Sequence, residues 1–103
     1  MDIEIQLLSH DKLQLGARLL KVLAHPVKLE ILQLLGESNA MDVSSLCEAI
    51  GPTCEISMMS HHLAKMKDNG ILTSEKLGKQ VFYSVADISI LNILTCLEQC
   101  ELI

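Results

Sequence analysis

The fold is decided by residues 42–85, which read DVSSLCEAIGPTCEISMMSHHLAKMKDNGILTSEKLGKQVFYSV. The first part of this stretch predicts two helices in succession. Asp42 can cap a short helix that ends near Ile50, because its side-chain oxygen can accept a hydrogen bond from the first turn. Gly51-Pro52 then breaks the helical pattern, and a longer helix is predicted from about Glu55 to Asn69.

A β-hairpin is predicted after these two helices. Residues 71–76 and 80–85 read as strands, and Leu77-Gly78-Lys79 supplies the turn between them. A short helix, a tight break, a longer helix and a hairpin, in this order, are typical of the winged form of the helix-turn-helix. The sequence therefore predicts a mainly α fold with a β-hairpin wing.

Further helices are predicted on both sides of this unit. Upstream, the apolar spacing predicts a helix over residues 11–24 and a second over 27–35, which begins after Pro26 and stops at Gly36. Downstream, Asp87 can cap a final helix that continues to the C-terminus. The expected order is four helices, two strands and one helix, in a single domain that takes in the whole chain.

The predicted helix over residues 55–69 has two different faces. At 100° per residue, an apolar side that we expect to pack on the preceding helix holds Ile56, Met59, Leu63 and Met66. The opposite side holds Ser57, Met58, His61, Ala64 and Lys65. Its short polar groups, histidine and lysine can approach base edges and phosphates, and the hairpin tip adds Lys76 and Lys79. The alternative interpretation is a solvated amphipathic helix beside a surface hairpin.

Composition limits the possible partners and the compartment. The 103-residue chain has a net charge of −5, but residues 65–80 hold four lysines against two acids, a local balance of +2. Such a patch can bind phosphates in a salt-sensitive way.

No apolar run approaches the ~20 residues that span a bilayer, and the acidic N-terminus is unlike a signal peptide. We therefore expect a cytoplasmic protein without a membrane partner, and half of its residues being hydrophobic favours association with a second copy.

Four motifs, in matching order, resemble the ArsR/SmtB family of repressors. Residues 21–32, KVLAHPVKLEIL, resemble the family opening K-x-L-a-h/d-P-x-R-L-x-I-L, and residues 59–63, MSHHL, resemble its recognition helix V-S-x-H-L. Residues 68–72, DNGIL, and 78–83, GKQVFY, resemble its helix exit and its wing. Each motif is weak alone, whereas the ordered set is specific and covers most of residues 18–87.

The resemblance implies a homodimer joined through its first and last helices. Such a dimer binds a partly palindromic double-stranded DNA operator and leaves it when an inducer binds. The residues that the resemblance places against DNA are Ser57, Ser60, His61 and Lys65. Two departures concern this surface: Met58 stands where a small polar residue is usual, and the turn before Ser60 is longer than usual and contains Cys54.

The four cysteines complete neither standard metal site of that family. In a reducing cytosol, thiols used for packing, metal binding or redox sensing are expected rather than disulfides. The last-helix pattern D-x-H-x10-H-x2-E/H matches at Asp87 alone, because the other positions hold Ser89, Cys100 and Ile103. Of the third-helix pattern C-x-C-D-x-C, only the last cysteine is present, as Cys47.

The cysteines nevertheless suggest a sensing site. Cys96 and Cys100 lie four residues apart on the predicted last helix, where Cβ atoms are about 5–6 Å apart, which suits one soft ion better than a disulfide. Cys54 precedes the recognition helix, whose positive end is expected to lower the pKa of the thiol and make it reactive. Cys47 shares a face with Leu46 and is expected to be a buried structural thiol rather than a ligand.

The histidines are expected to have separate roles. On a helix His61 and His62 point about 100° apart, so they do not share a metal ion easily. We expect His61 to face DNA and His62 to flank the core. His25 lies directly before Pro26 and is expected to cap or pack rather than to bind a metal.

Three hypotheses for the function follow. The leading one is a repressor that needs no cofactor for DNA binding and is released when Cys96 and Cys100 capture trivalent arsenic or a soft metal ion. The second keeps the repressor but makes the signal an oxidant or a persulfide, with Cys54 as the attacking thiolate. The third is a winged-helix protein-interaction module without DNA binding, which the charge of −5 and Met58 favour. An enzyme is not expected, because no nucleophile–base–acid set or phosphate-binding loop is present.

Overall fold

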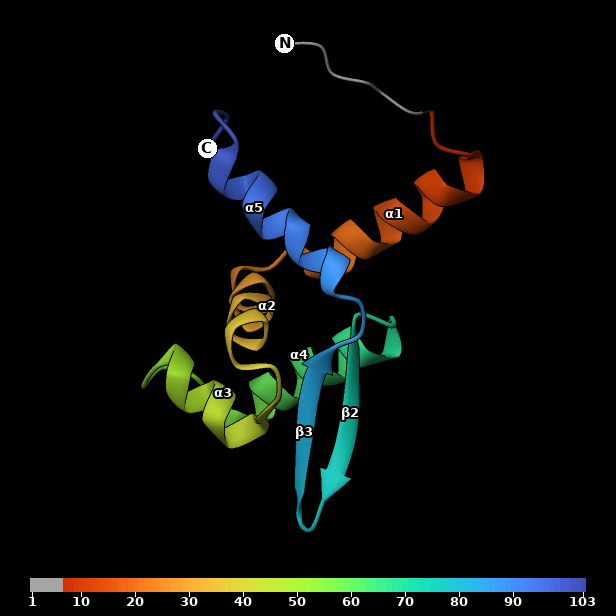
Figure 1. Ribbon diagram of the computed structural model, residues 1–103. Coiled ribbons are helices and arrows are strands. Elements are labelled where there is room, and N and C mark those ends of the chain that lie inside the picture. Colours follow the sequence, from red (N-terminus) through yellow and green to blue (C-terminus); the bar gives the residue numbers. More distant parts are fainter. Residues whose placement is uncertain (1–6) are drawn as a thin grey trace.

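The computed structural model describes residues 7–103, and its elements follow the order predicted from the sequence, with two short additions (Figure 1). Along the chain they are α1 (His10–Leu23), α2 (Pro26–Ser38), β1 (Met41–Asp42), α3 (Val43–Ile50), α4 (Ile56–Asp68), β2 (Leu72–Leu77), β3 (Gln80–Val85), the 3₁₀-helix η1 (Ile88–Leu91) and α5 (Asn92–Gln99). This is a winged helix-turn-helix, as predicted, and the additions are β1 and η1.

Side-chain caps determine where three of the helices begin. The backbone N–H of Lys12 donates to Oγ of Ser9 at 3.1 Å, before α1. The N–H of Val27 donates to Nδ1 of His25 at 3.1 Å, which confirms His25 as the cap of α2. The N–H of Ser45 donates to Oδ1 of Asp42 at 3.2 Å and confirms the predicted cap of α3. Each cap satisfies a backbone donor that the first turn of a helix leaves free.

Two predicted helix ends are wrong. The second helix does not stop at Gly36 but continues to Ser38, and it is Asn39 that adopts a positive φ of 67°. Gly36 instead allows a close approach, since a Cβ on it would lie 3.3 Å from the side chain of Leu91. The last helix also does not run unbroken to the C-terminus: Asp87 caps η1, and α5 ends at Gln99.

The wing belongs to a three-stranded antiparallel sheet in the order β1-β3-β2. β2 and β3 pair along their whole length, from Leu72 opposite Val85 to Leu77 opposite Gln80, so the turn is shorter than predicted. The two residues of β1 extend the other side of β3 and were not predicted, since two residues are too few for a strand pattern. Nε2 of Gln80 donates to Oδ2 of Asp42 at 3.1 Å, which ties the wing to the start of α3.

The core lies between α2, α3, α4 and the start of β2. Its largest fully buried side chains are Ile31, Leu32, Leu35, Leu46, Met59, Leu63, Met66 and Leu72. Three of the four residues predicted for the apolar face of α4 are among them. The fourth, Ile56, is wrong: it occupies the first turn of α4 at the edge of the core, where 52% of the residue stays exposed.

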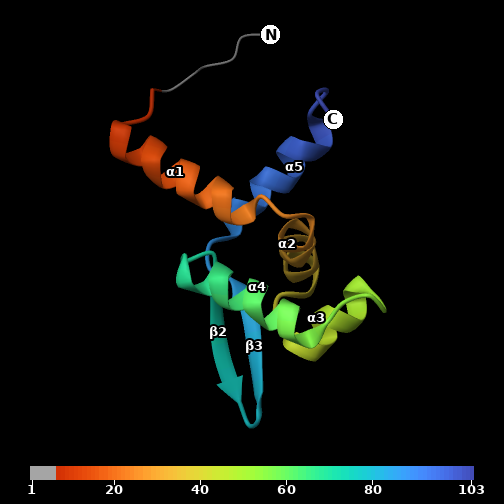
Figure 2. The same ribbon diagram turned by 180° about the vertical axis from the view of Figure 1, so that it is seen from behind.

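The two ends of the molecule carry different elements. α1 and α5 project from one end, and the β2–β3 hairpin projects from the opposite end, as both views show (Figures 1 and 2). α3 and α4 lie toward the hairpin end, and α2 lies between the two groups. Within residues 7–103, none of the helices has the length and apolarity to cross a membrane.

Candidate nucleic-acid interface and cysteine sites

One face of α4 is open to solvent over its whole length. Ser57, Met58, Ser60, His61 and Lys65 are all exposed, whereas Met59, Leu63 and Met66 on the opposite face are fully buried. The division follows the 3.6-residue period of the helix. The residues predicted to face DNA therefore lie together on one accessible surface, and Met58, 49% exposed, adds a flexible apolar side chain to it.

The N-terminal end of α4 contributes backbone donors to the same surface. Glu55 is the N-cap residue, and its side chain makes no capping hydrogen bond to the first turn. Backbone N–H groups at such an end, together with the helix dipole, favour an anionic group. The surface thus combines uncapped N–H groups with hydroxyl, imidazole and ammonium donors.

The wing places its two lysines beyond the body of the molecule. Lys76 lies on β2, and Lys79 forms the two-residue turn together with Gly78. Gly78 has a φ of 63°, a left-handed conformation that glycine tolerates. Both lysines are exposed. The hairpin projects at the end of the molecule where α4 lies, so both elements are available to one elongated partner (Figure 2).

A further cation lies beneath this surface. Lys28 on α2 is buried, and its pKa is lowered, first by that burial and then by the charge of Lys65. The two ammonium groups are therefore close enough to repel each other. Sequence reasoning had treated Lys28 only as part of a motif, because nothing in the local pattern shows that α2 brings it near α4.

His62 faces inward, as predicted, and His61 is exposed. Nδ1 of His62 is buried and has no hydrogen-bond partner among residues 7–103, and the His62 ring lies 4.6 Å from the His25 ring between centroids. Burial lowers the pKa of His62, and the nearby His25, Lys28 and His61 lower it further. His62 is therefore kept neutral near pH 7.

Cys96 and Cys100 do not form the helical pair expected from their spacing. Cys96 is exposed on α5, but Cys100 is the C-cap residue with an extended backbone, because α5 ends at Gln99. Within residues 7–103, no three His, Cys, Asp or Glu side chains come together to hold a metal ion. The pair at the end of α5 thus offers two sulfur ligands at most from one chain.

Cys47 and Cys54 lie together instead, which sequence reasoning missed. Cys47 is buried on α3, and Cys54 packs against the core cluster to which Cys47 belongs. The neighbouring Cys47 side chain, then burial, raises the pKa of Cys54 to about 11. Sγ of Cys54 donates to the carbonyl oxygen of Glu55 at 3.8 Å. The expected lowering of the Cys54 pKa by the α4 helix end is therefore wrong, because Cys47, burial and the charges of Glu30 and Glu55 all favour the neutral thiol. The available signal was the Gly51-Pro52 break, which folds the chain back between the two cysteines.

Known proteins share this architecture and sequence pattern. The model of the family "Bacterial regulatory protein, arsR family" matches residues 25–74. The HTH-type transcriptional regulator YgaV of Escherichia coli (strain K12) is 32% identical over 83 residues, which are 81% of this chain and 82% of that protein. The arsenical resistance operon repressor of the same strain is 35% identical over 72 residues, 70% of this chain and 60% of that protein.

A solved structure is similar along nearly its whole length. The crystal structure of the transcriptional repressor PagR of Bacillus anthracis matches with a TM-score of 0.75 and 28% identity. The match covers 86% of this chain and 99% of that one. The helical framework and the wing are therefore arranged as in a transcriptional repressor, and the relatives are regulators rather than enzymes.

Proposed function

The chain belongs to the arsR family of bacterial regulatory proteins and is a transcriptional repressor, and we propose that it binds operator DNA as a homodimer in the cytoplasm. The observation that carries this proposal is the continuous exposed face of α4, together with two exposed lysines on the wing that projects from the same end of the molecule. Such a face fits the major groove, where recognition helices read base edges. The whole chain acts as one DNA-binding and dimerisation domain.

Each side chain of this surface has a proposed role. Ser57, Ser60 and His61 contact base edges, because short hydroxyls and an exposed imidazole can donate or accept hydrogen bonds there. Lys65 binds a phosphate at the groove edge, and Lys76 and Lys79 bind the backbone flanking it. Met58 contributes an apolar contact. The net charge of −5 keeps this binding dependent on the local basic patch and hence on salt.

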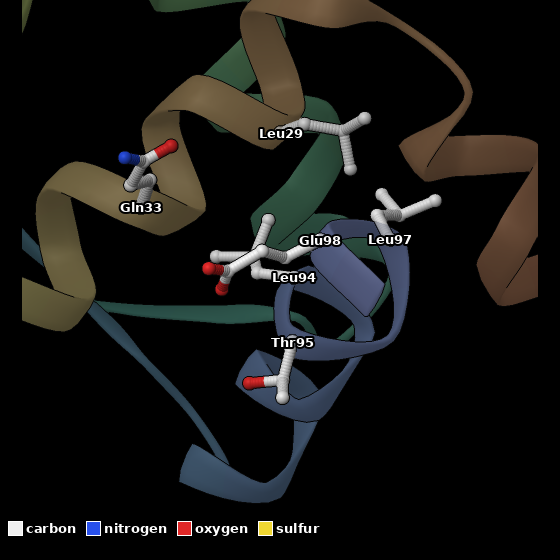
Figure 3. A pocket seen from close by; sticks show the side chains of 6 residues that line it. All are labelled: Leu29, Gln33, Leu94, Thr95, Leu97 and Glu98. Carbon is white, nitrogen blue, oxygen red and sulfur yellow. The ribbon is translucent and has the colours of Figure 1, made fainter. Parts of the chain in front are cut away.

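Dimerisation through α1 and α5 is supported by the apolar surface at that end. Leu13, Leu15 and Leu20 of α1 are each more than half exposed. A cavity of about 560 Å³ also lies between α2 and α5, lined by Leu29, Gln33, Leu94, Thr95, Leu97 and Glu98 (Figure 3). A second copy would bury these apolar side chains, and a two-fold axis would place two α4 helices on a partly palindromic site.

The inducer is proposed to act through cysteine. A relative is an arsenical resistance operon repressor, and the exposed Cys96 with the half-buried Cys100 offers sulfur to a thiophilic species such as trivalent arsenic or a soft metal ion. DNA binding itself needs no cofactor in this proposal. Oxidants or persulfides are the alternative signal, which the exposure of Cys96 favours.

Fluorescence anisotropy on the protein's own upstream DNA tests the proposal. We expect the protein, reduced with a phosphine, to bind tightly, with a salt dependence whose slope falls by about 0.9 for each lysine lost from the wing. Lys76→Ala and Lys79→Ala are the variants, and Lys12→Ala, on the exposed side of α1, is the matched control. Arsenite should release the DNA. Absence of any specific binding would refute the operator proposal, and unchanged binding with arsenite would move the inducer to oxidants or persulfides.

A further inference from the structure

We propose that the cavity between α2, α3 and α4 binds a small neutral aromatic molecule that carries a hydroxyl group, and that this ligand weakens the contact of α4 with DNA. The ligand is held by packing and by one hydrogen bond, with no covalent bond to a cysteine and no metal ion. The binding site stands on the geometry of the cavity alone, and only the effect on DNA rests on the proposed repressor function.

The cavity lies behind the first turns of α4 and has a volume of about 280 Å³. Its apolar walls come from three helices: Val27 of α2, Ile50 at the end of α3, and Met58 and Met59 of α4. An apolar cavity on the order of 150 Å³ already accepts benzene. This cavity therefore has room for one aromatic ring with a short substituent.

The two methionines favour an aromatic ligand over an aliphatic one. A thioether sulfur is polarisable and makes favourable contacts with ring edges, and an unbranched side chain adapts to the shape of a ligand. Met59 is fully buried and forms a fixed wall, whereas Met58 is 49% exposed and is free to close over a ring. Both walls therefore suit a flat aromatic group.

A pair of histidines forms the polar wall of the same cavity. His25 and His62 both line it, and their ring centroids lie 4.6 Å apart. Nδ1 of His25 already accepts the backbone N–H of Val27 at 3.1 Å, whereas Nδ1 of His62 is buried with no partner among residues 7–103. An unpaired buried nitrogen costs free energy. A turn of the His62 imidazole about its Cβ–Cγ bond lets this nitrogen pair with a polar group in the cavity.

The surrounding charges select a neutral hydroxyl as that polar group. Glu55 also lines the cavity and repels an anion. A cation is repelled by Lys28, whose charge contributes to the lowered pKa of His62. A hydroxyl both donates and accepts hydrogen bonds, so it can pair with either neutral tautomer of His62. An aromatic ring with one hydroxyl, as in the phenols, satisfies the apolar and the polar walls together.

The site is coupled to the proposed DNA-facing surface through shared residues. Met58 lines the cavity and also belongs to the exposed face of α4. His62 lines the cavity from the inner side, and its neighbour His61 is exposed on the outer side. A ligand that holds Met58 against its ring withdraws this side chain from the DNA-facing surface. We therefore expect DNA affinity to fall while the core stays folded.

The first test is an NMR titration of the reduced, full-length protein with phenol. We expect saturable amide shifts centred on Val27, Ile50 and Met59, with a dissociation constant of about 1 mM or lower. Benzene, which lacks the hydroxyl, should bind about fivefold more weakly, and benzoate should also bind more weakly than phenol. No saturation up to about 10 mM, or shifts centred on the cavity between α2 and α5, would overturn the site. Equal affinity for phenol and benzene would overturn the hydrogen bond, and tighter binding of benzoate would overturn the neutral class.

Two variants with matched controls locate the ligand. Val27→Phe fills the cavity and should abolish phenol binding, whereas Val43→Phe should not, because Val43 is also half-buried in the first turn of a helix but does not line the cavity. His62→Phe keeps the ring but removes its nitrogens, so phenol and benzene should bind alike, whereas His61→Phe should keep the preference for phenol. Undiminished phenol binding in Val27→Phe would contradict the site. If Val27→Phe does not fold, the His62→Phe comparison decides.

A second readout separates this site from the repressor function. Saturating phenol should weaken operator binding of the wild type at least tenfold and should leave Val27→Phe unaffected. Unchanged operator binding of the saturated wild type would overturn the coupling to α4. Failure of the untreated protein to bind DNA would refute the repressor function and leave the NMR titration to decide on the site.

Discussion

The two ends of the molecule differ in how fully they bury their apolar side chains. Around α3 and α4 the core side chains Leu46, Leu63 and Met66 are completely covered by the chain itself. At the opposite end, Leu13 and Leu20 of α1 are more than half exposed, and α5 contains no buried residue. The helix-turn-helix end is therefore complete within one chain, whereas the α1–α5 end keeps apolar surface that a second copy can cover.

The four cysteines also lie two at each end of the molecule. Cys47 and Cys54 share the complete end, where their surroundings are already set by α3, α4 and the turn between them. Cys96 and Cys100 lie at the incomplete end, where a partner would change their exposure. A dimer joined through α1 and α5 would thus affect the second pair and leave the first as it is.

The largest effect on stability should come from removing a core side chain at the helix-turn-helix end. Leu63→Ala removes a fully buried side chain, and we expect the free energy of unfolding to fall by about 2–5 kcal/mol, since a cavity remains in the core. Chemical denaturation followed by circular dichroism measures this. Leu102→Ala, at a residue 93% exposed, is the control and should stay within about 0.5 kcal/mol of the wild type. A similarly small change for Leu63→Ala would contradict the division between the ends.

A charge at the incomplete end should break the dimer rather than the fold. Leu13→Glu places a carboxylate in the exposed apolar stripe of α1, and we expect dimer affinity to fall at least tenfold with unchanged helical content. Sedimentation at several protein concentrations measures the association. Leu77→Glu on the wing is the matched control, because Leu77 and Leu13 are both 55% exposed, and it should leave the dimer intact. Equal loss in both variants would argue against an interface at α1.

Acid should weaken the complete end through His62. The pKa of His62 is lowered in the folded state, so the unfolded chain takes up the proton more readily. The free energy of unfolding that His62 contributes is therefore fully present above its ordinary pKa of 6.5, and it is lost as the pH falls below that value. Denaturation at pH 8 and pH 5 should show this loss, and His62→Gln should reduce it, whereas His61→Gln should not. The lowered pKa values of Asp42 and Asp87 act only below about 3.8, so they do not contribute in this range.

The smallest effect concerns a single methyl group on the DNA. If exposed Met58 contacts a thymine methyl, replacing that thymine by deoxyuridine should weaken wild-type binding by about 0.8 kcal/mol, roughly fourfold. Met58→Ala should bind both operators alike, which a scan of each thymine by anisotropy can measure. A scan in which wild type and Met58→Ala respond identically at every position would remove Met58 from the interface.

Much of the fold could be predicted because it depends on local chemistry. Asp42 and His25 cap helices through hydrogen bonds to residues two or three positions away, and such patterns are visible in the sequence. The helix end predicted at Gly36 was wrong, because this glycine allows the close approach of Leu91, a residue far along the chain. The two-residue β1 depends in the same way on its pairing with β3. Cys100 lies outside α5, which ends at Gln99, one residue before it.

The sequence by itself determined the order of the helices, the wing, the two faces of α4 and the membership of the family. These properties follow from residue periodicity and short motifs, which fold in nearly the same way wherever they occur. Only the tertiary structure decided that Cys100 lies outside α5, why the pKa of Cys54 rises rather than falls, and that Lys28 lies near Lys65. Those outcomes depend on burial and on charges from other elements, and neither can be read from the spacing of residues along one helix.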